Sequence, residues 1–250
     1  MAFRSDYPYE NNVYIVKRYN EHTAKIIFCK SVRQKGWEDE QPKAKRGYAS
    51  EAKETCNISR ARSRVRELAL CNPWDWWCTF TIDKEKYNRY ELGTFRKDFA
   101  EFIHNLNRRR PEEDKIKYLF VPEQHKDGAW HIHGFIKGLS EKEVYKNKYR
   151  YWSWKPYEDK FGFISMSKIK NLERTASYVQ KYISKDLENS VSELNKHIFF
   201  SSQGLKCADL LFQGQGKFKG SWDWEHEDGY SKIKNIDLRK ETIEDFLEVE

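Results

Sequence analysis

Two histidines, His131 and His133, stand one residue apart in a segment whose pattern predicts a β-strand. Side chains alternate between the two faces of a strand, so both imidazoles are expected on one face and Ile132 on the other. A hairpin turn at Asp127-Gly128 would place Glu123 opposite His131, because Asp-Gly supplies the positive φ of a tight loop. Two imidazoles and a carboxylate on one face form an open-sided site for a divalent cation. The alternative is two half-buried strand histidines beside a surface glutamate.

A second group of reactive side chains lies in residues 171–187, where the pattern predicts one helix capped at its start by an asparagine. The apolar arc of this helix is Leu172, Ala176, Val179 and Ile183. A separate sector carries two phenols and two ammonium groups: Tyr178, Lys181, Tyr182 and Lys185. A phenol is a weak nucleophile at neutral pH, and nearby lysines favour the phenolate and can hold a phosphate. The alternative is that the tyrosines pack and the lysines are solvent charges.

The elements expected to position these groups alternate between strands and helices. The histidines belong to a predicted hairpin over Lys115–Lys137, in which His125 and Gln124 are further candidate ligands with a less favourable orientation. Further strands are predicted over residues 12–16, 24–28, 76–82, 161–169 and 197–203. Helices are predicted from Asn57 to Asn72-Pro73 and over 88–107, with a charged loop over 31–55. This order predicts an α+β fold, an antiparallel sheet backed by helices.

Two segments could bind nucleic acid. The helix that begins at Asn57 carries four basic side chains, which could grip phosphates or could form a solvated face: Arg60, Arg62, Arg64 and Arg66. The connection over residues 145–157 is aromatic and basic, so it could stack unpaired bases or could be an ordinary packed insertion.

Composition restricts the class of protein. The 250 residues are 16% aromatic with a mean hydropathy of −0.95 and a net charge of +7. Residues 221–250 hold ten acidic and four basic side chains, which leaves a net charge of +13 on residues 1–220. A basic, aromatic chain suits a nucleic-acid partner. No apolar run could span a bilayer and no leader is visible at residues 1–6, so we expect a cytosolic protein with no membrane partner. The five cysteines form no Cys-x-x-Cys pair and are expected to be reduced thiols.

Three ordered motifs resemble those of HUH endonucleases: Phe80-Thr81-Ile82, then Glu123 with His131-Ile132-His133-Gly134-Phe135, then the segment from Tyr178 to Asp186. Within this superfamily the chain most resembles rolling-circle replication initiators of plasmids and single-stranded DNA phages. The resemblance covers about Pro73 to Gly204. It implies a five-stranded antiparallel sheet of ferredoxin or RRM type.

The resemblance also implies an activity. By position, Glu123, His131 and His133 would hold Mg²⁺ or Mn²⁺, and Tyr178 or Tyr182 would attack a DNA phosphate. The products would be a 5′-phosphotyrosine and a free 3′-OH. Lys181 or Lys185 would stabilise the charge that develops. The division of the chain would be 1–72 as N-terminal strands, arm and arginine-rich helix, 73–213 as the endonuclease domain and 214–250 as an acidic tail.

The expected partner is single-stranded or origin DNA. Gly214-Gln215-Gly216-Lys217 lacks the spacing of a nucleotide-binding loop, so we expect no nucleotide cofactor and unwinding by a host helicase. A transposase or mobilisation relaxase would share the same chemistry. A non-catalytic single-strand binding module, whose tyrosines stack bases, is the alternative from another class.

Overall fold

The computed structural model describes residues 9–33, 51–183 and 199–249, with no description of the side chains of 51–57. The chain forms two compact units, one made of residues 1–48 with 207–250 and the other of residues 49–206. This division differs from the predicted one, because the arginine-rich helix belongs with the histidine hairpin and the tail belongs with the N-terminal strands. Within the described residues, no helix has the length and apolarity that crossing a membrane requires.

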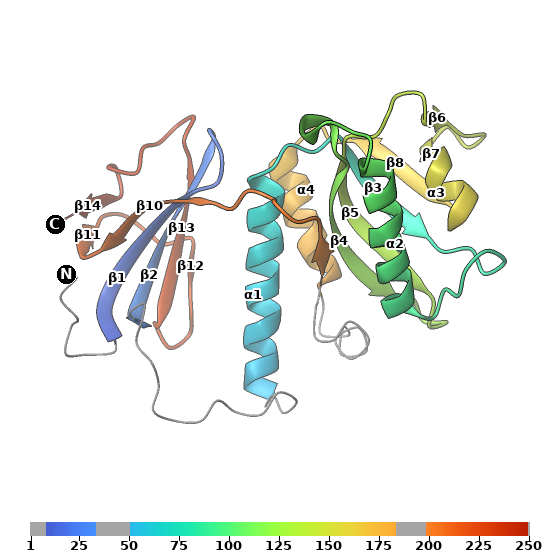
Figure 1. The fold of residues 1–250 in the computed structure, drawn as a ribbon. Helices are drawn as coiled ribbons and strands as arrows, with labels where there is room; N and C mark the ends of the chain where they lie inside the picture. The colour runs from blue at the N-terminus through green and yellow to red at the C-terminus, as the bar shows by residue number, and fades with distance from the viewer. Residues whose placement is uncertain (1–8, 34–50, 184–198, 250) are drawn as a thin grey trace, which may run out of the picture. The chain divides into compact units, whose positions relative to one another are not determined.

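The unit of residues 49–206 contains one large sheet with helices on both faces (Figure 1). Its strands are β3 (Trp76–Thr81), β4 (Lys117–Gln124), β5 (Trp130–Lys137), β6 (Val144–Lys146), β7 (Trp152–Trp154), β8 (Ile164–Lys168) and β9 (Phe200–Ser201). Its helices are α1 (Glu51–Leu70), α2 (Leu92–Asn107), α3 (Lys155–Lys160) and α4 (Leu172–Val179), with short 3₁₀ turns η1 (Glu112–Asp114) and η2 (Gln180–Tyr182).

The strand order of this sheet is β6-β7-β8-β3-β5-β4-β9, and every pair is antiparallel. The predicted α+β class with an antiparallel sheet is therefore confirmed. The sheet that holds the histidines has seven strands in place of the predicted five. The two additional strands on one edge, β6 and β7, come from the aromatic connection, where the sequence pattern predicts no strand.

One face of the sheet packs against α2 and α3. Helix α2 buries an apolar stripe, Leu92, Phe95, Phe99 and Ile103, because these residues recur at helical spacing. They meet alternate strand residues in a single core: Cys78, Phe80, Phe120, Ile132, Ile136 and Ile164. Burying Ile132 in this core directs its neighbours, His131 and His133, to the opposite face.

The opposite face lies on the side of α1 and α4 (Figure 1). Helix α1 begins at Glu51, so the prediction that Asn57 caps it is wrong. Residues 51–54 are Glu, Ala, Lys and Glu, which favour a helix strongly enough to extend it. The predicted loop over 31–55 is therefore wrong at both ends, since 31–33 belong to a strand; residues 34–50 lie outside the described part of the chain.

Helix α4 is capped as predicted, because the Asn171 side chain accepts a hydrogen bond from the Arg174 amide at 2.8 Å. The predicted buried arc is present, with Ala176, Val179 and Ile183 fully buried. The prediction of one continuous helix is wrong, because the α-helix ends at Val179 and continues as the 3₁₀ turn η2. Residues 184–198 lie outside the described part, so the predicted end of the helix and the start of the predicted strand 197–203 have no structural description.

The other unit is built from both ends of the chain. Its strands are β1 (Tyr9–Arg18), β2 (Thr23–Arg33), β10 (Asp209–Gly214), β11 (Gly216–Phe218), β12 (Trp224–Glu225), β13 (Ser231–Asp237) and β14 (Leu247–Val249). Five of them form a sheet in the order β10-β1-β2-β13-β12, and β11 pairs with β14. The expectation of an irregular acidic tail is therefore wrong, since residues 209–249 supply partners for the N-terminal hairpin.

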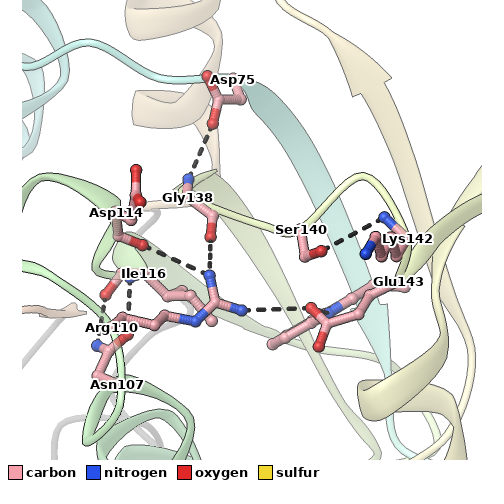
Figure 2. Close-up of polar contacts among 10 residues, drawn as sticks. Asp75, Asn107, Arg110, Asp114, Ile116, Gly138, Ser140, Lys142 and Glu143 are labelled. Carbon is pink, nitrogen blue, oxygen red and sulfur yellow. Dashed lines mark hydrogen bonds and ion pairs between the residues drawn. The ribbon is translucent and has the colours of Figure 1, made fainter.

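The connection from β5 to β6 is fixed by a network around Arg110 (Figure 2). The guanidinium donates to the carbonyl oxygen of Gly138 at 2.5 Å and to the Glu143 carboxylate at 3.4 Å. The Gly138 amide in turn donates to Asp75 at 2.9 Å. Gly138 has a φ of +77°, and a Cβ there would lie 2.7 Å from the Lys115 carbonyl oxygen, so glycine is required at this position.

Candidate active site

The candidate site lies on the central strands of the seven-stranded sheet, on the face that does not carry the α2 core. Strand β5 pairs with β4 so that Glu123 stands directly opposite His131, as the hairpin turn predicts. On its other side β5 pairs with β3, which sets Thr79 opposite His133 and Thr81 opposite His131. A Thr-x-Thr pair and a His-x-His pair therefore face each other across neighbouring strands.

His133 is held by a partner at each ring nitrogen. Its Nε2 lies 2.7 Å from the Glu123 carboxylate, and its Nδ1 lies 3.2 Å from the Thr79 hydroxyl. The residue is only 6% exposed. Burial lowers the pKa of the His133 imidazole, and this effect exceeds the opposing effect of the hydrogen bond to Glu123.

His131 has a threonine partner and an aromatic one. Its Nδ1 lies 3.5 Å from the Thr81 hydroxyl, and its ring stacks on His125 with ring centroids 3.7 Å apart and an angle of 11°. Burial lowers the pKa of His131 to about 4, and the neighbouring imidazoles of His125 and His133 act in the same direction. The His131 ring is therefore neutral at pH 7, which is the form that can bind a metal ion.

The two helix tyrosines lie on this histidine face. The Tyr182 ring stacks on the His133 ring, with centroids 3.9 Å apart and an angle of 12°. The Tyr182 hydroxyl donates to the Tyr178 oxygen at 2.7 Å. Burial raises the pKa of Tyr182 above the ordinary phenol value, and the Tyr178 hydrogen bond and the charge of Glu123 raise it further. Tyr178 is 44% exposed, so its oxygen is open to a ligand.

Trp77 is a member of the site that sequence reasoning missed. Its indole contacts both tyrosines, with centroid distances of 5.6 Å to Tyr178 and 6.2 Å to Tyr182, and it also packs on Phe135 at 5.4 Å. Trp77 alternates with Cys78 along β3, so it lies on the same face as Thr79. It holds the two phenol rings against the histidine face from the centre of the sheet.

The predicted basic residues have separate positions. The ammonium group of Lys181 lies 5.4 Å from the centre of the Tyr178 ring, and Lys185 lies outside the described residues. Arg62 donates from Nε to the carbonyl oxygen of Ile183 at 2.8 Å, which ties α1 to the end of the tyrosine turn. Arg64 forms an ion pair with Glu67 at 3.0 Å. Two of the four predicted DNA-binding arginines therefore have partners within the chain.

The donor set fits a hard divalent cation in its chemistry. Two imidazoles and a carboxylate from adjacent strands share one face, and a threonine hydroxyl can donate or accept at Nδ1 of His133. His133 Nε2 could therefore exchange its bond to Glu123 for a cation without leaving Nδ1 unsatisfied. Among the described residues no three His, Cys, Asp or Glu side chains are already arranged as a ligand set.

The site thus offers two phenol oxygens next to neutral imidazoles and a carboxylate. Two of its members could have been found from alternation: Trp77 and Thr79 lie on the β3 face opposite to the buried Trp76, Cys78 and Phe80. Thr81 was part of the first motif, but no sequence feature showed that its hydroxyl meets His131. That contact depends on β3 lying next to β5, which the sequence does not indicate.

A family model described as Replication-associated protein ORF2 matches residues 75–187 of the chain. The matched segment includes the three motifs, and the match is consistent with a rolling-circle replication initiator family, so the predicted resemblance is confirmed over this segment. No curated protein matches the chain, and no solved structure matches it.

Proposed function

We propose that this replication-associated protein is a nicking and strand-transfer enzyme that opens single-stranded origin DNA and later rejoins it. The premise is the match of residues 75–187 to a replication-associated family. The single observation that carries the proposal is the stacking of Tyr182 on His133 together with the 2.7 Å hydrogen bond between the two tyrosine oxygens. A nucleophile and a candidate cation site from distant parts of the sequence are thereby adjacent.

In the proposed reaction, the oxygen of Tyr178 or Tyr182 forms a bond to the phosphorus of a DNA phosphodiester. The bond from that phosphorus to the 3′ oxygen of the preceding nucleotide breaks. The phenol loses its proton and the released oxygen gains one, so the products are a 5′-phosphotyrosine and a 3′-hydroxyl. One phosphodiester replaces another, so the step needs no nucleotide cofactor and its reversal rejoins the strand.

The chain's own residues would orient and neutralise the reacting groups. Glu123, His131 and His133 would hold Mg²⁺ or Mn²⁺, which supplies neutralisation of the phosphate charge and Lewis-acid polarisation. Lys181, whose ammonium already lies over the Tyr178 ring, would offset the charge of the phosphate near that oxygen. Trp77 would limit the motion of both phenol rings, which keeps either oxygen within reach of one phosphate. A host helicase would unwind the duplex.

The test is covalent capture. Full-length protein is incubated with a labelled single-stranded oligonucleotide and Mn²⁺ and then denatured. The proposal predicts a protein–DNA adduct that survives denaturant and is absent when a chelator is present. A non-catalytic binding module would give retention that salt abolishes and no adduct, which would contradict the proposal.

A further inference from the structure

The loop between β6 and β7 carries an unusual surface. Residues 144–151 contain three tyrosines and three basic residues and no acidic one. All six of these side chains are exposed: Tyr145, Lys146, Lys148, Tyr149, Arg150 and Tyr151. Tyr149 and Tyr151 are 62% and 56% exposed, so most of each ring is in contact with solvent. Large aromatic side chains that remain this exposed are candidates for ligand contact.

The remaining aromatic residues of the same connection are packed. Trp154 and Tyr157 are completely buried in the core on the α2 face, and Trp152 packs against Trp76 with centroids 5.4 Å apart. The two readings of this connection, packed insertion and base-stacking surface, therefore apply to different parts of it. The tryptophans fix the stem, and the tyrosines of the loop are left outside the core.

The loop backbone is held in one conformation. The Asn147 side-chain oxygen accepts from the amides of Tyr149 at 3.0 Å and Tyr151 at 3.1 Å. The Asn147 amide donates to the Tyr151 carbonyl at 2.9 Å, which closes the loop. Arg150 has a φ of 65°, in the left-handed region that a non-glycine residue adopts only at a cost. An arginine at this position suggests that its side chain has a use.

The stem is also fixed at its base. Glu143, directly before β6, accepts from Arg110 at 3.4 Å and from the Trp154 indole at 3.5 Å; Figure 2 shows the contact with Arg110. The Tyr145 hydroxyl donates to the Glu158 carboxylate of α3. A rigid loop that presents aromatic rings binds at a low cost in conformational entropy.

We propose that the β6–β7 loop is a binding subsite for single-stranded DNA, with bases stacked on Tyr149 and Tyr151 and phosphates held by Lys148 and Arg150. Alternating aromatic and cationic side chains match the repeat of a single strand, in which each nucleotide offers one flat base and one phosphate. Lys148 already lies 5.0 Å from the centre of the Tyr149 ring, so a ring and a cation are presented together. A duplex would not expose its base faces to these rings, so it should bind less tightly.

This subsite deepens the proposed function, because the strand that it binds would be the one that is nicked. Strands β7, β8 and β3 separate β6 from β5. Four strand spacings amount to roughly 20 Å across the sheet. At about 3.4 Å per nucleotide, a strand would need roughly six nucleotides to reach from the loop to the histidines. Oligonucleotides shorter than this should gain nothing from the loop when they occupy the site.

The test measures affinity in the presence of a chelator, so that binding is observed without nicking. The affinity of the full-length protein for a labelled single strand of about 20 nucleotides, long enough to span the loop and the site, is measured by fluorescence anisotropy. The double variant Tyr149→Ala with Tyr151→Ala should bind roughly 10-fold or more weakly. The corresponding double phenylalanine variant keeps both rings and should bind within about twofold of the wild type, because stacking needs the ring and not the hydroxyl. The matched control is Tyr9→Ala, which removes a similarly exposed tyrosine elsewhere.

The charges are tested by salt dependence. Replacing Lys148 and Arg150 by glutamine should reduce the slope of log affinity against log salt by about 1.4, since each phosphate contact on a single strand contributes about 0.7. Replacing the exposed Lys84 and Lys240 instead should change the slope less. Arg150→Gly controls for folding, because glycine accepts a φ of 65° and should leave the thermal midpoint unchanged while weakening binding.

The outcomes separate the subsite from the nicking activity. Adduct formation by the wild type together with unchanged affinity and salt slope in all loop variants would overturn the subsite and leave the nicking function standing. The surface would then belong to another partner, such as an acidic protein. Weakened binding in the loop variants without any adduct in the wild type would support the subsite and contradict the nicking function.

Discussion

The ring of Tyr182 lies parallel to the imidazole of His133, with centroids 3.9 Å apart and an angle of 12°. The imidazole stands on a strand of the hairpin and the phenol on the 3₁₀ turn that follows α4. This contact brings the second and third motifs of the chain into one site. It also fixes the depth at which the tyrosine turn sits against the sheet, since the histidine is buried and cannot move aside freely.

The histidines are expected to be needed for nicking and not for affinity. His131→Ala and His133→Ala should each reduce nicking in Mn²⁺ about 1000-fold or more, because the loss of a ligand removes several kcal/mol of charge stabilisation from the transition state. Affinity for the single strand should change little. Gel assays of nicking and anisotropy of binding measure the two effects, with the helix residue His104→Ala as the control. Nicking that persists in a chelator would contradict the metal assignment.

Thr79 is expected to act through His133. Thr79→Val keeps the shape and the β-branching of the side chain but removes the hydroxyl that meets Nδ1 at 3.2 Å. Loss of such a partner lowers metal affinity about 10- to 100-fold. The Mn²⁺ concentration for half-maximal nicking should therefore rise by this factor, while the rate at saturating Mn²⁺ changes much less. Thr79→Ser keeps the hydroxyl and should restore the wild-type Mn²⁺ requirement; failure to do so would point to packing alone.

Arg62 is expected to position the tyrosine turn. Its guanidinium donates to the Ile183 carbonyl, directly after Tyr182, at 2.8 Å. Arg62→Gln should therefore lower the rate of adduct formation by about 10-fold, because small displacements of a nucleophile have large kinetic effects. Arg60→Gln is the matched control, since Arg60 is an exposed arginine of the same helix. Equal effects of the two changes on rate and on DNA affinity would instead indicate that both arginines only contact phosphates.

Two glycines are expected to matter for different reasons. A Cβ at Gly134 would overlap the Leu119 carbonyl oxygen of the paired strand, so Gly134→Ala should lower the free energy of unfolding by about 3 kcal/mol. Gly204 has a φ of +72° with no atom within 4 Å of a Cβ, so Gly204→Ala should cost only about 1 kcal/mol from backbone strain. Urea unfolding followed by circular dichroism measures both. A small effect at Gly134 would show that β4 and β5 can separate without loss of the fold.

The hairpin and the tyrosine face could be predicted because both depend on local sequence. The Asp127-Gly128 turn fixes the register that sets Glu123 opposite His131, and helical spacing brings Tyr178 and Tyr182 together. The change from α-helix to 3₁₀ turn after Val179 did not affect that pairing, because side chains four residues apart remain neighbours in either form.

What could not be predicted depends on contacts between distant parts of the chain. Thr79 and Trp77 became members of the site only because β3 is the neighbour of β5, and strand order is set by the whole sheet. The tail provides β10, which pairs with β1 through Tyr14 and Gly214, a pairing 200 residues apart in sequence. Its short strands and many charges have no local pattern that distinguishes them from an acidic tail. For the same reason, the aromatic connection could not be divided into buried tryptophans and exposed tyrosines.

The measurement that tests the account most directly is the identification of the residue that becomes linked to DNA. Wild-type protein is incubated with a single-stranded oligonucleotide and Mn²⁺, digested, and the adducted peptide is mapped by mass spectrometry. The account predicts a phosphodiester on Tyr178 or Tyr182, different effects of Tyr178→Phe and Tyr182→Phe on a single cleavage, and no adduct in the double variant. An adduct at another residue, or full activity in the double variant, would contradict it.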